Sequence, residues 1–205
     1  MQATRLYLIR HGTTAANQAG VFLGRTDAPL NDVGLQEADR LGSRLREVPF
    51  ERIVSSDLSR ARVTAEHVAA GRAVRLDPRL REMDLGDFDG LVASDVHAAN
   101  PELIAAWRSD PTDVRMPNGE TLSEVQRRAV HALEQLAAEH PGGSVAVVTH
   151  TFVLLSVIAH VLGVPLASFR RLFVDRASLS LVDWKAGGTP VLRGFNDVSH
   201  LEGSR

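Results

Sequence analysis

The chain has 205 residues, no cysteine, a formal net charge of −2 and a hydrophobic fraction of 44%. We expect one domain spanning residues 1–205, and the ordinary apolar content excludes a disordered chain. Without cysteine, the protein has no disulfide, thiol nucleophile or cysteine-bound metal. The near-neutral charge argues against nucleic acid as a partner, because such binding requires many cations facing phosphates. Residues 1–8 do not resemble a signal peptide, so a cytoplasmic location is expected.

The first half of the chain alternates between strand and helix patterns. Alternating apolar residues predict a strand at Thr4–Arg10, and a glycine-containing loop follows from Gly12 to Asn31. Asn31 is suited to cap an amphipathic helix that ends near Glu47. The other elements expected here are a strand at Arg52–Ser55, a helix at Leu58–Ala70 and a strand at Ala73–Leu76.

The middle of the chain is less periodic, and a helix with a clear start follows it. Short helical segments are expected near Ser94–Ala99 and Pro101–Arg108. Thr121 and Glu124 form a capping-box pattern that opens a long helix, which ends near Glu139.

The stretch Ser144–Phe169 has no formally charged residue and is long enough to suggest a membrane span. Its start, residues 144–149, is rich in β-branched side chains, which favours a strand buried on both faces. Gly163 and Pro165 limit the following helix to about a dozen residues, too few to cross a bilayer, so no membrane partner is expected. The last strands are expected at Leu172–Val174, Leu179–Trp184 and Val191–Phe195, with a turn at Gly187-Gly188.

Strands that alternate with helices predict an α/β fold. We expect a three-layer sandwich, in which a mostly parallel central sheet is covered by helices on both faces. In such open sheets, ligands bind beyond the carboxyl ends of the strands. Polar residues at those ends are therefore the first candidates for a functional site.

Arg10, His11 and Gly12 lie at the end of the first predicted strand. His11 is a candidate nucleophile or acid–base group, and Arg10 is a candidate clamp for phosphate oxygens. Gly12 would let the backbone approach a ligand closely. The tripeptide is a weak signal by itself, since a histidine at a strand end is often only a hydrogen-bonded polar residue.

Three further segments carry candidate residues. Arg60 lies in the first turn of a predicted helix, which Ser55 or Asp57 would cap. A cation there opposes the helix dipole unless an anion binds nearby. His150 follows the most buried predicted strand. The loop around Glu82 concentrates acidic residues, and this composition by itself favours a solvated turn.

The candidate segments belong to a longer series of short motifs between residues 5 and 201. The motifs are R-H-G-x-T-x-x-N at 10–17, G-x-x-D-x-P-L at 24–30, S-S-x-L-x-R-A-x-x-T-A at 55–65, L-x-E-x-x-x-G-x-x-x-G at 80–90, N-G-E-T at 118–121, T-H at 149–150 and N-D-V-S-H-L at 196–201. This ordered series resembles the histidine phosphatase superfamily, in the branch that contains cofactor-dependent phosphoglycerate mutases and their phosphatase relatives. Ordered agreement of this kind is far more specific than any single motif.

The resemblance implies a phosphoglycerate mutase-like fold and a reaction through phosphohistidine. His11 is the implied nucleophile, while Arg10, Arg60 and His150 hold the phosphoryl oxygens. Glu82 is implied to give a proton to the leaving alcohol and then to take one from water. Phosphoryl transfer depends mainly on positioning and charge neutralisation, so these groups require no metal and no cofactor. The further candidates for contact with the substrate are Asn17, Gly24, Arg25, Arg81 and Thr151.

The chain departs from the family pattern at two places. Thr13 stands where the family usually has Glu or Gln, which should change a peripheral contact. Thr151 and Phe152 follow the second histidine where the family typically has glycine, so a side chain should narrow the pocket. The ending around His200 either folds over the site or pairs within the sheet. The remaining histidines have no metal-ligand spacing.

The leading hypothesis is a metal-independent phosphomonoesterase that acts on a small phosphorylated metabolite. The closest alternative is a cofactor-dependent phosphoglycerate mutase, but residues 90–118 are short for a mutase insertion and lack a basic cluster that would retain a second phosphate. A non-catalytic phosphate-binding module is a distant alternative. The physiological substrate and the oligomeric state stay open, although an exposed sheet edge would permit a homodimer.

Overall fold

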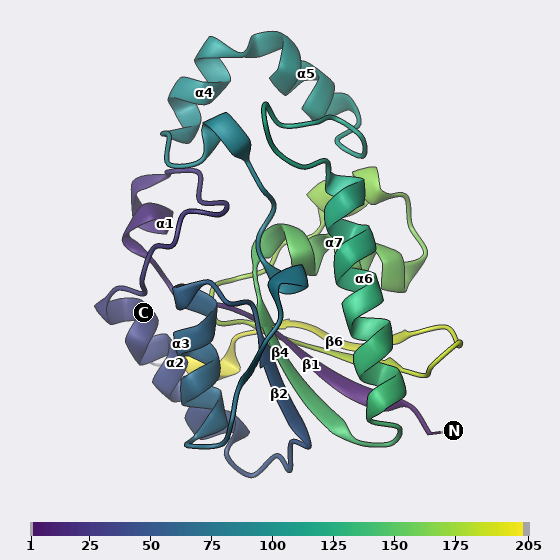
Figure 1. Cartoon of the computed structure of the whole chain (residues 1–205). Helices are drawn as coiled ribbons and strands as arrows, with labels where there is room; N and C mark the ends of the chain where they lie inside the picture. Colours follow the sequence, from purple (N-terminus) through teal and green to yellow (C-terminus); the bar gives the residue numbers. More distant parts are fainter. Residues whose placement is uncertain (1, 203–205) are drawn as a thin grey trace.

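Six strands form one sheet within residues 2–202, the part of the chain that this computed structural model describes (Figure 1). The strands stand in the order β3-β2-β4-β1-β5-β6, and the neighbours from β3 to β1 are parallel. β5 and β6 run antiparallel to their neighbours. The bounds are Thr4–Arg10 for β1, Arg52–Ser55 for β2, Arg75–Leu76 for β3, Ser144–Thr149 for β4, Leu179–Trp184 for β5 and Val191–Asp197 for β6. The expected mostly parallel sheet is confirmed.

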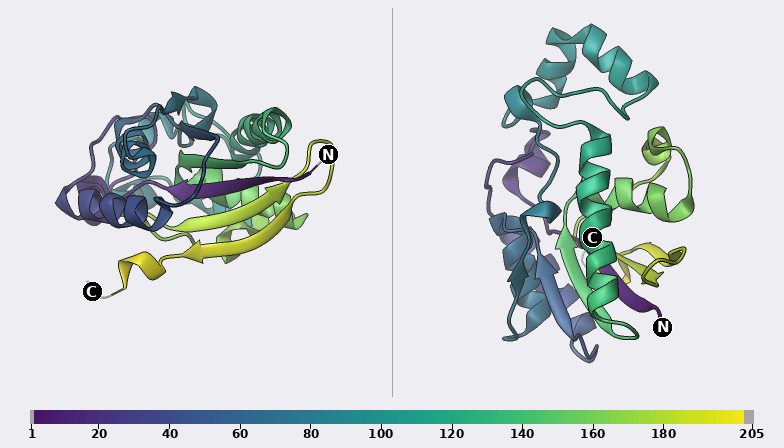
Figure 2. Two further views of the ribbon diagram at one scale, coloured as in Figure 1. Left: turned by 90° about the horizontal axis from the view of Figure 1, so that it is seen from below. Right: turned by 45° about the vertical axis from the view of Figure 1, so that its right-hand side comes forward.

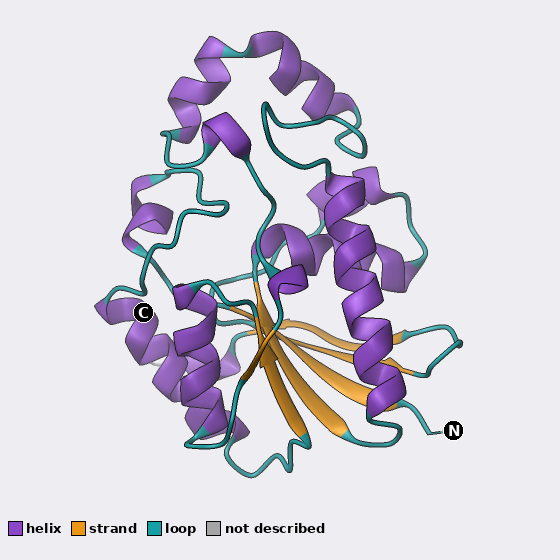
Figure 3. Ribbon diagram, viewed as in Figure 1, coloured by secondary structure: helices purple, strands orange, loops and turns teal. Residues whose placement is uncertain are grey.

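Helices cover both faces of the sheet, as the further views of Figure 2 and the colouring of Figure 3 show. On one face, α2 (Asp32–Leu45) and α3 (Ser59–Ala69) pack against each other, and α3 contacts β2 and β4. On the other face, α6 (Leu122–Glu139) and α7 (Thr151–Leu162) pair and contact β1. The other helical segments are α1 (Ala15–Ala19), α4 (Ala93–Ala99), α5 (Pro101–Ser109) and the 3₁₀ turns Pro78–Leu80, Gly86–Phe88, Leu166–Arg171 and Ser199–Leu201. The predicted three-layer α/β class is confirmed.

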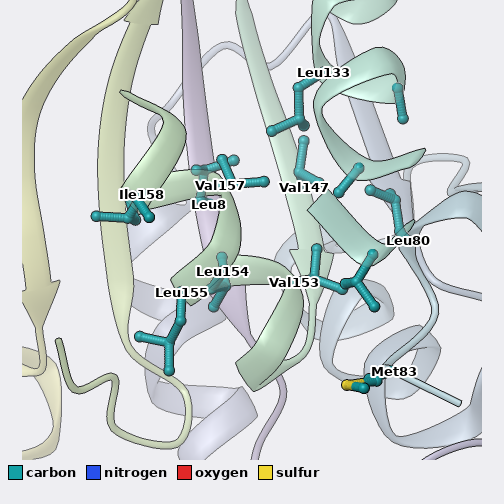
Figure 4. Packing of buried hydrophobic residues seen from close by; sticks show 14 of the residues in the cluster. Leu8, Leu80, Met83, Leu133, Val147, Val153, Leu154, Leu155, Val157 and Ile158 are labelled. Atoms are coloured by element: carbon teal, nitrogen blue, oxygen red, sulfur yellow. The ribbon is translucent and has the colours of Figure 1, made fainter. Parts of the chain in front are cut away.

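Alternating residues of the central strands divide the apolar core into two halves. Leu8 of β1 and Val147 of β4 face α6 and α7, within the cluster drawn in Figure 4. The next residues along each strand, Ile9 and Val148, belong to the cluster on the side of α2 and α3. A strand buried on both faces leaves little room for polar side chains along its length. Polar residues on these strands are therefore found mainly at their ends.

The starts of α2 and α6 follow their predicted caps. Asn31 accepts a hydrogen bond from the backbone N–H of Gly34 at 2.9 Å. Thr121 and Glu124 form the expected capping box, in which each side chain accepts from the other residue's backbone N–H. These contacts satisfy N–H groups that have no partner inside the helix. α2 ends at Leu45, slightly earlier than the sequence suggested.

The caps predicted for α3, Ser55 and Asp57, are both wrong. The residue that precedes the helix, Leu58, makes no side-chain hydrogen bond to it. The backbone N–H of Ser59 instead donates to Asp27 Oδ1 at 2.7 Å, so a carboxylate from a distant loop satisfies this helix end. Local sequence cannot reveal a cap that arrives from another part of the chain.

The strand predicted at Leu172–Val174 is also wrong, since this described segment is irregular. β5 and β6 occupy the sheet positions beyond β1, and among the described residues this segment pairs with no strand. The Val174 carbonyl instead accepts a hydrogen bond from Arg10 Nη1 at 2.7 Å. The predicted turn at Gly187-Gly188 is present, with the Gly188 N–H donating to the Lys185 carbonyl at 2.9 Å.

No helix within residues 2–202 is long and apolar enough to cross a membrane. The uncharged stretch that begins at Ser144 forms β4 and the 12-residue helix α7, as predicted. Most residues of both elements are buried against the rest of the protein, which accounts for their lack of charge.

α4 and α5 stand beyond the sheet at the top of Figure 1, and we call these two helices the cap. Their bounds match the predicted helical segments to within a residue, with Asn100 between them. α4 buries only Val96 and α5 only Ile104. The cap therefore adds little to the core, and most of its surface is available for other contacts.

Candidate active site

Two histidines lie side by side at the carboxyl ends of the central strands. His11 follows β1 and His150 follows β4, and these strands pair in parallel with Arg10 opposite Thr149. The backbone N–H of His11 donates to the Thr149 carbonyl at 3.0 Å. The two imidazole rings consequently approach to 5.1 Å between centroids. The register of the sheet therefore brings together residues that are far apart in the sequence.

The His11 ring is held by its own backbone neighbour. Nδ1 lies 2.7 Å from the Gly12 carbonyl oxygen, and because a carbonyl can only accept, Nδ1 carries the proton in this contact. Nε2 is then the nitrogen with the free lone pair. A Cβ atom at position 12 would meet the Gly34 carbonyl oxygen at 2.6 Å, so this close backbone approach requires glycine. The Gly12 N–H donates to Thr64 Oγ1 at 3.2 Å, which ties the loop to α3.

Burial and positive neighbours keep His11 neutral. Only 3% of the residue is exposed. Burial, and then the charges of Arg60 and Arg10, lower the pKa of the His11 imidazole well below its usual value. A neutral imidazole with a free Nε2 is the form that can act as a nucleophile.

His150 is positioned by a serine at the end of β2. Its Nε2 lies 2.8 Å from Ser56 Oγ, and the same oxygen accepts from the Leu58 N–H at 3.3 Å. The Ser56 hydroxyl can donate its proton to Nε2, and in that tautomer a neutral His150 carries its own proton on Nδ1. Burial, and then Arg60 and His11, lower the pKa of His150 well below its usual value. A bound anion would offset this effect and favour the protonated ring.

A buried arginine, Arg60, and a half-buried one, Arg10, flank the histidines. Arg60 is 1% exposed and donates to the carbonyls of Thr26 and Gly24 at 2.9 and 2.8 Å. Arg10 Nη1 donates to the Val174 carbonyl at 2.7 Å. Burial lowers the pKa of both guanidinium groups, that of Arg10 to about 10. Among the described residues, neither arginine forms an ion pair with a carboxylate.

Three side-chain nitrogens of this site are buried without a hydrogen-bond partner: Arg10 Nε, Arg60 Nε and His150 Nδ1, which is a donor when the ring carries a proton there. Unpaired buried donors are rare in folded proteins, because each costs the free energy of its lost hydration. Three together, two of them cationic, indicate a site for an anion with several oxygens. We call Arg10, His11, Arg60, Glu82 and His150 the strand-end site.

Glu82 is buried, so the solvated turn suggested by its acidic loop is wrong. Its Oε1 accepts from the backbone N–H groups of Met83 at 3.0 Å and Phe152 at 3.1 Å. Burial raises the pKa of this carboxyl, although the Met83 N–H and the charges of Arg60 and Arg10 oppose the shift. A carboxyl with a raised pKa is suited to donate and accept protons near neutral pH.

The other acids of this loop have structural partners. Asp89 accepts from the backbone N–H groups of Gly24 and Thr26 at 2.8 and 2.7 Å, which secures the loop that Arg60 also holds. Asp87 accepts from Asn118, and Asp84 accepts from the Gly86 N–H. Only Glu82 of this loop reaches the first turn of α7.

Arg128 was not identified from the sequence, yet it organises the loop that carries Glu82. It donates to the carbonyls of Arg79 and Arg81 at 2.6 Å and of Glu82 at 3.0 Å, and it pairs with Glu120. A signal existed in the helix pattern, since the half-buried Arg128 lies beside the buried residues Val125 and Ala129 of α6. Ser56 and Thr64 were inside the quoted motifs, but no local pattern revealed what they contact.

The residues predicted to contact a substrate have these positions. The Asn17 side chain accepts from the Thr14 N–H at 3.2 Å within a capping box, and Gly24 offers its carbonyl to Arg60. Arg25 lies 3.3 Å from Glu120, and Arg81 pairs with Asp57 through two hydrogen bonds. Thr151 is the half-buried first residue of α7.

Thr13 and the ending around His200 have clear positions in the structure. The Thr13 hydroxyl and N–H both bind Glu37, at 2.9 and 2.7 Å, so this departure from the family pattern does create a peripheral contact. His200 Nε2 lies 3.0 Å from the carbonyl of Ala177, and the N–H of the same Ala177 donates to the His11 carbonyl at 3.1 Å, so the ending braces the strand-end loop. Within residues 2–202, no group of three or more His, Asp or Glu side chains could hold a metal ion.

The comparisons with known proteins agree with this geometry. Residues 6–198 match the family model of the histidine phosphatase superfamily (branch 1), and the chain belongs to this superfamily. An adenosylcobalamin/alpha-ribazole phosphatase of Salmonella typhimurium is 36% identical over 87% of this chain and 90% of the relative. A probable phosphoglycerate mutase of Erwinia tasmaniensis is 34% identical over 97% of this chain and 95% of the relative. The solved structure of Bacillus stearothermophilus YhfR superposes with a TM-score of 0.92 at 35% identity, over 98% of this chain and all of the other.

Proposed function

We propose that this histidine phosphatase hydrolyses a small phosphate monoester through a phosphohistidine formed at His11. The supporting observation is the set of three unpaired buried nitrogens on Arg10, Arg60 and His150, around a histidine whose Nε2 is free. A phosphoryl group has the charge and the number of oxygens to satisfy these donors. We assign phosphoryl binding to these three residues, with Asn17 and Thr151 at the rim.

The reaction has two steps. In the first, His11 Nε2 attacks phosphorus, the bond to the ester oxygen breaks, and Glu82 gives its proton to the departing alcohol. In the second, water attacks phosphohistidine, Glu82 takes a proton from that water, and the N–P bond breaks to release phosphate. The raised pKa of Glu82 and the lowered pKa of His11 suit these starting states. Charge on the phosphoryl oxygens is neutralised by Arg10 and Arg60, so no metal is needed.

A phosphoglycerate mutase is the second candidate, because several relatives carry the name of probable phosphoglycerate mutases and the chemistry of the first step is shared. A mutase must retain a bisphosphorylated intermediate, whereas a phosphatase must admit water to phosphohistidine. The residues between Gly90 and Asn118 form only the short cap and its connections. A short cap of this kind favours access of water, and hence hydrolysis.

The deciding experiment supplies 3-phosphoglycerate with catalytic 2,3-bisphosphoglycerate and follows two products. We expect release of inorganic phosphate without formation of 2-phosphoglycerate. Isomerisation that outpaces phosphate release would assign the protein to the mutases instead. Retention of an acid-labile phosphoryl group on His11 during turnover is expected in either case, so its absence would contradict the shared mechanism.

A further inference from the structure

A cavity of about 210 Å³ lies between the cap and the first turn of α7, and we call it the cap cavity. It adjoins the strand-end site through two residues. The backbone N–H of Phe152 binds the Glu82 carboxylate, while the Phe152 side chain lines the cavity. Leu85, which lines the cavity as well, belongs to the loop that Glu82 begins. A group that receives a proton from Glu82 would therefore lie next to this cavity.

The walls of the cap cavity are mainly apolar. Trp107 and Ile104 of α5 face Phe22, Met116 and Phe152 from other parts of the chain. Trp107 and Phe152 are in edge-to-face contact, with ring centroids 6.1 Å apart at 89°. Such walls bind flat or branched apolar groups better than polyhydroxylated ones, because hydroxyl groups would lose hydrogen bonds to water there.

Two arginines at this cavity have no acidic partner. Arg108 of α5 and Arg170, which follows α7, both line it, and no aspartate or glutamate does. Arg170 donates to the Trp107 carbonyl at 2.7 Å and lies 5.5 Å from the centroid of the Phe169 ring. Arg108 forms no hydrogen bond or ion pair with any described residue. Burial, and then the charge of Arg108, lower the pKa of Arg170, so the two guanidinium groups lie close enough to repel each other.

We propose that the cap cavity binds the alcohol part of the ester, and that the preferred substrates are phosphate esters of aryl-sized alcohols with an anionic group remote from the phosphate. This inference rests on the proposed phosphatase function. Glu82 sets the position of the ester oxygen, Trp107 and Phe152 bind the apolar body, and Arg108 with Arg170 bind the anionic end. An anion there relieves the repulsion between two guanidinium groups and gains charge-assisted hydrogen bonds. Both arginines are exposed and neither forms an ion pair with a described residue, so each can turn toward a bound anion without first losing a carboxylate partner.

The test compares 4-carboxyphenyl phosphate with 4-carbamoylphenyl phosphate, which have nearly the same shape and differ in charge. We expect kcat/KM to favour the carboxylate by about tenfold, which is the effect of a charge-assisted hydrogen bond of ordinary strength. Arg108→Gln and Arg170→Gln should each reduce this preference, and the double variant should abolish it. Arg171→Gln is the matched control, since Arg171 is an exposed neighbour that does not line the cavity. Equal rates with the two esters, or an equal loss in the control, would overturn the proposal.

Variants of Trp107 test whether the cap cavity binds the apolar body of the alcohol. Trp107→Ala should lower kcat/KM for 4-carbamoylphenyl phosphate but leave that for methyl phosphate unchanged, because a methyl group is too small to reach the indole. Trp107→Phe preserves an aromatic wall and should retain most of the activity, which separates a lost contact from a disordered cap. Similar losses on both esters would show that Trp107 supports the fold and not the substrate.

Failure of this inference can be distinguished from failure of the proposed function. If methyl phosphate is hydrolysed and phosphohistidine forms at His11 while the carboxylate preference is missing, the phosphatase assignment stands and the substrate class is wrong. If no ester is hydrolysed and no phosphohistidine forms, the proposed function itself is wrong.

Discussion

The strand-end site and the cap cavity meet at Glu82, but they differ in where their residues come from. The strand-end site takes His11, Arg60 and His150 from the ends of strands or the first turn of a helix, and its donors are fully buried. The cap cavity takes Arg108 and Arg170 from exposed positions on a short helix and a 3₁₀ turn. The core holds the first region rigidly, whereas few buried contacts support the second. We infer that chemistry depends on the former and substrate choice on the latter.

The largest expected effect is the loss of the nucleophile. His11→Ala should lower turnover of any ester by at least about 10⁴-fold, because no other group can form the covalent intermediate. The acid-labile phosphoenzyme should disappear as well, as measured by trapping with radiolabelled substrate. His131→Ala, at an exposed position of α6, is the control and should behave as the unaltered protein. Phosphoenzyme that persists in His11→Ala would refute the assignment.

Glu82→Gln should separate two kinds of ester. An alkyl alkoxide needs a proton as it leaves, so phosphoenzyme formation from alkyl esters should slow by about 10²–10⁴-fold. The phenolate of p-nitrophenyl phosphate leaves without help, so this ester should still give a burst of p-nitrophenol, followed by slow turnover because water lacks its base. Rapid-quench measurement of the first step tests this difference. Equal slowing of both esters would shift the role of acid to Asp84, Asp87 or Asp89.

Ser56→Ala should lower kcat/KM by roughly 10- to 100-fold, the cost of leaving a buried polar group without its partner. Ser56 Oγ is the hydrogen-bond partner of His150 Nε2, and losing it frees the ring to adopt the wrong tautomer. Ser55→Ala is a matched control, since Ser55 is equally buried but binds only the Ser56 carbonyl. Ser56→Thr retains the hydroxyl and should restore activity. Similar losses in the two alanine variants would indicate a purely structural role.

The pH dependence of kcat/KM should follow Glu82, whose pKa is raised, and His11, whose pKa is lowered. Glu82 must be protonated to assist an alkyl leaving group, so kcat/KM for alkyl esters should fall as pH rises through its raised pKa, by up to about tenfold per pH unit. His11 must be neutral, and because its pKa is lowered, its protonation should reduce the rate only well below pH 6.5. Aryl esters should lack the alkaline decline. An alkaline decline of the same size with both kinds of ester would contradict the role of Glu82.

The smallest expected effect is that of chelation. Dialysis against EDTA should leave the rate unchanged, because Arg10, Arg60 and His150 supply the positive charge that a metal provides in other phosphatases. The rate of phosphate release from p-nitrophenyl phosphate, measured before and after dialysis, tests this prediction. A rate that falls and is restored by magnesium would show that these side chains do not neutralise the phosphoryl group alone.

Much of the fold and the centre of the site could be predicted from the sequence. The α/β class, the buried strand β4 and the caps at Asn31 and Thr121 all follow from local patterns of apolar and capping residues. His11 and His150 were identifiable because each ends a strand, and parallel strands bring their carboxyl ends to one edge of a sheet. Their roles in the reaction stay predictions until the variants are measured.

Other features were decided only by the tertiary structure. The cap of α3 is Asp27 from a distant loop, and the segment at Leu172–Val174 is irregular and binds Arg10 through the Val174 carbonyl. Ser56 meets His150 only through the register of β2 beside β4. Arg108 and Arg170 come from separate segments, so residues 90–118 contain no basic cluster although the folded protein has one. Hydrophobic periodicity and caps act within a few residues, whereas these contacts depend on how whole elements pack against each other.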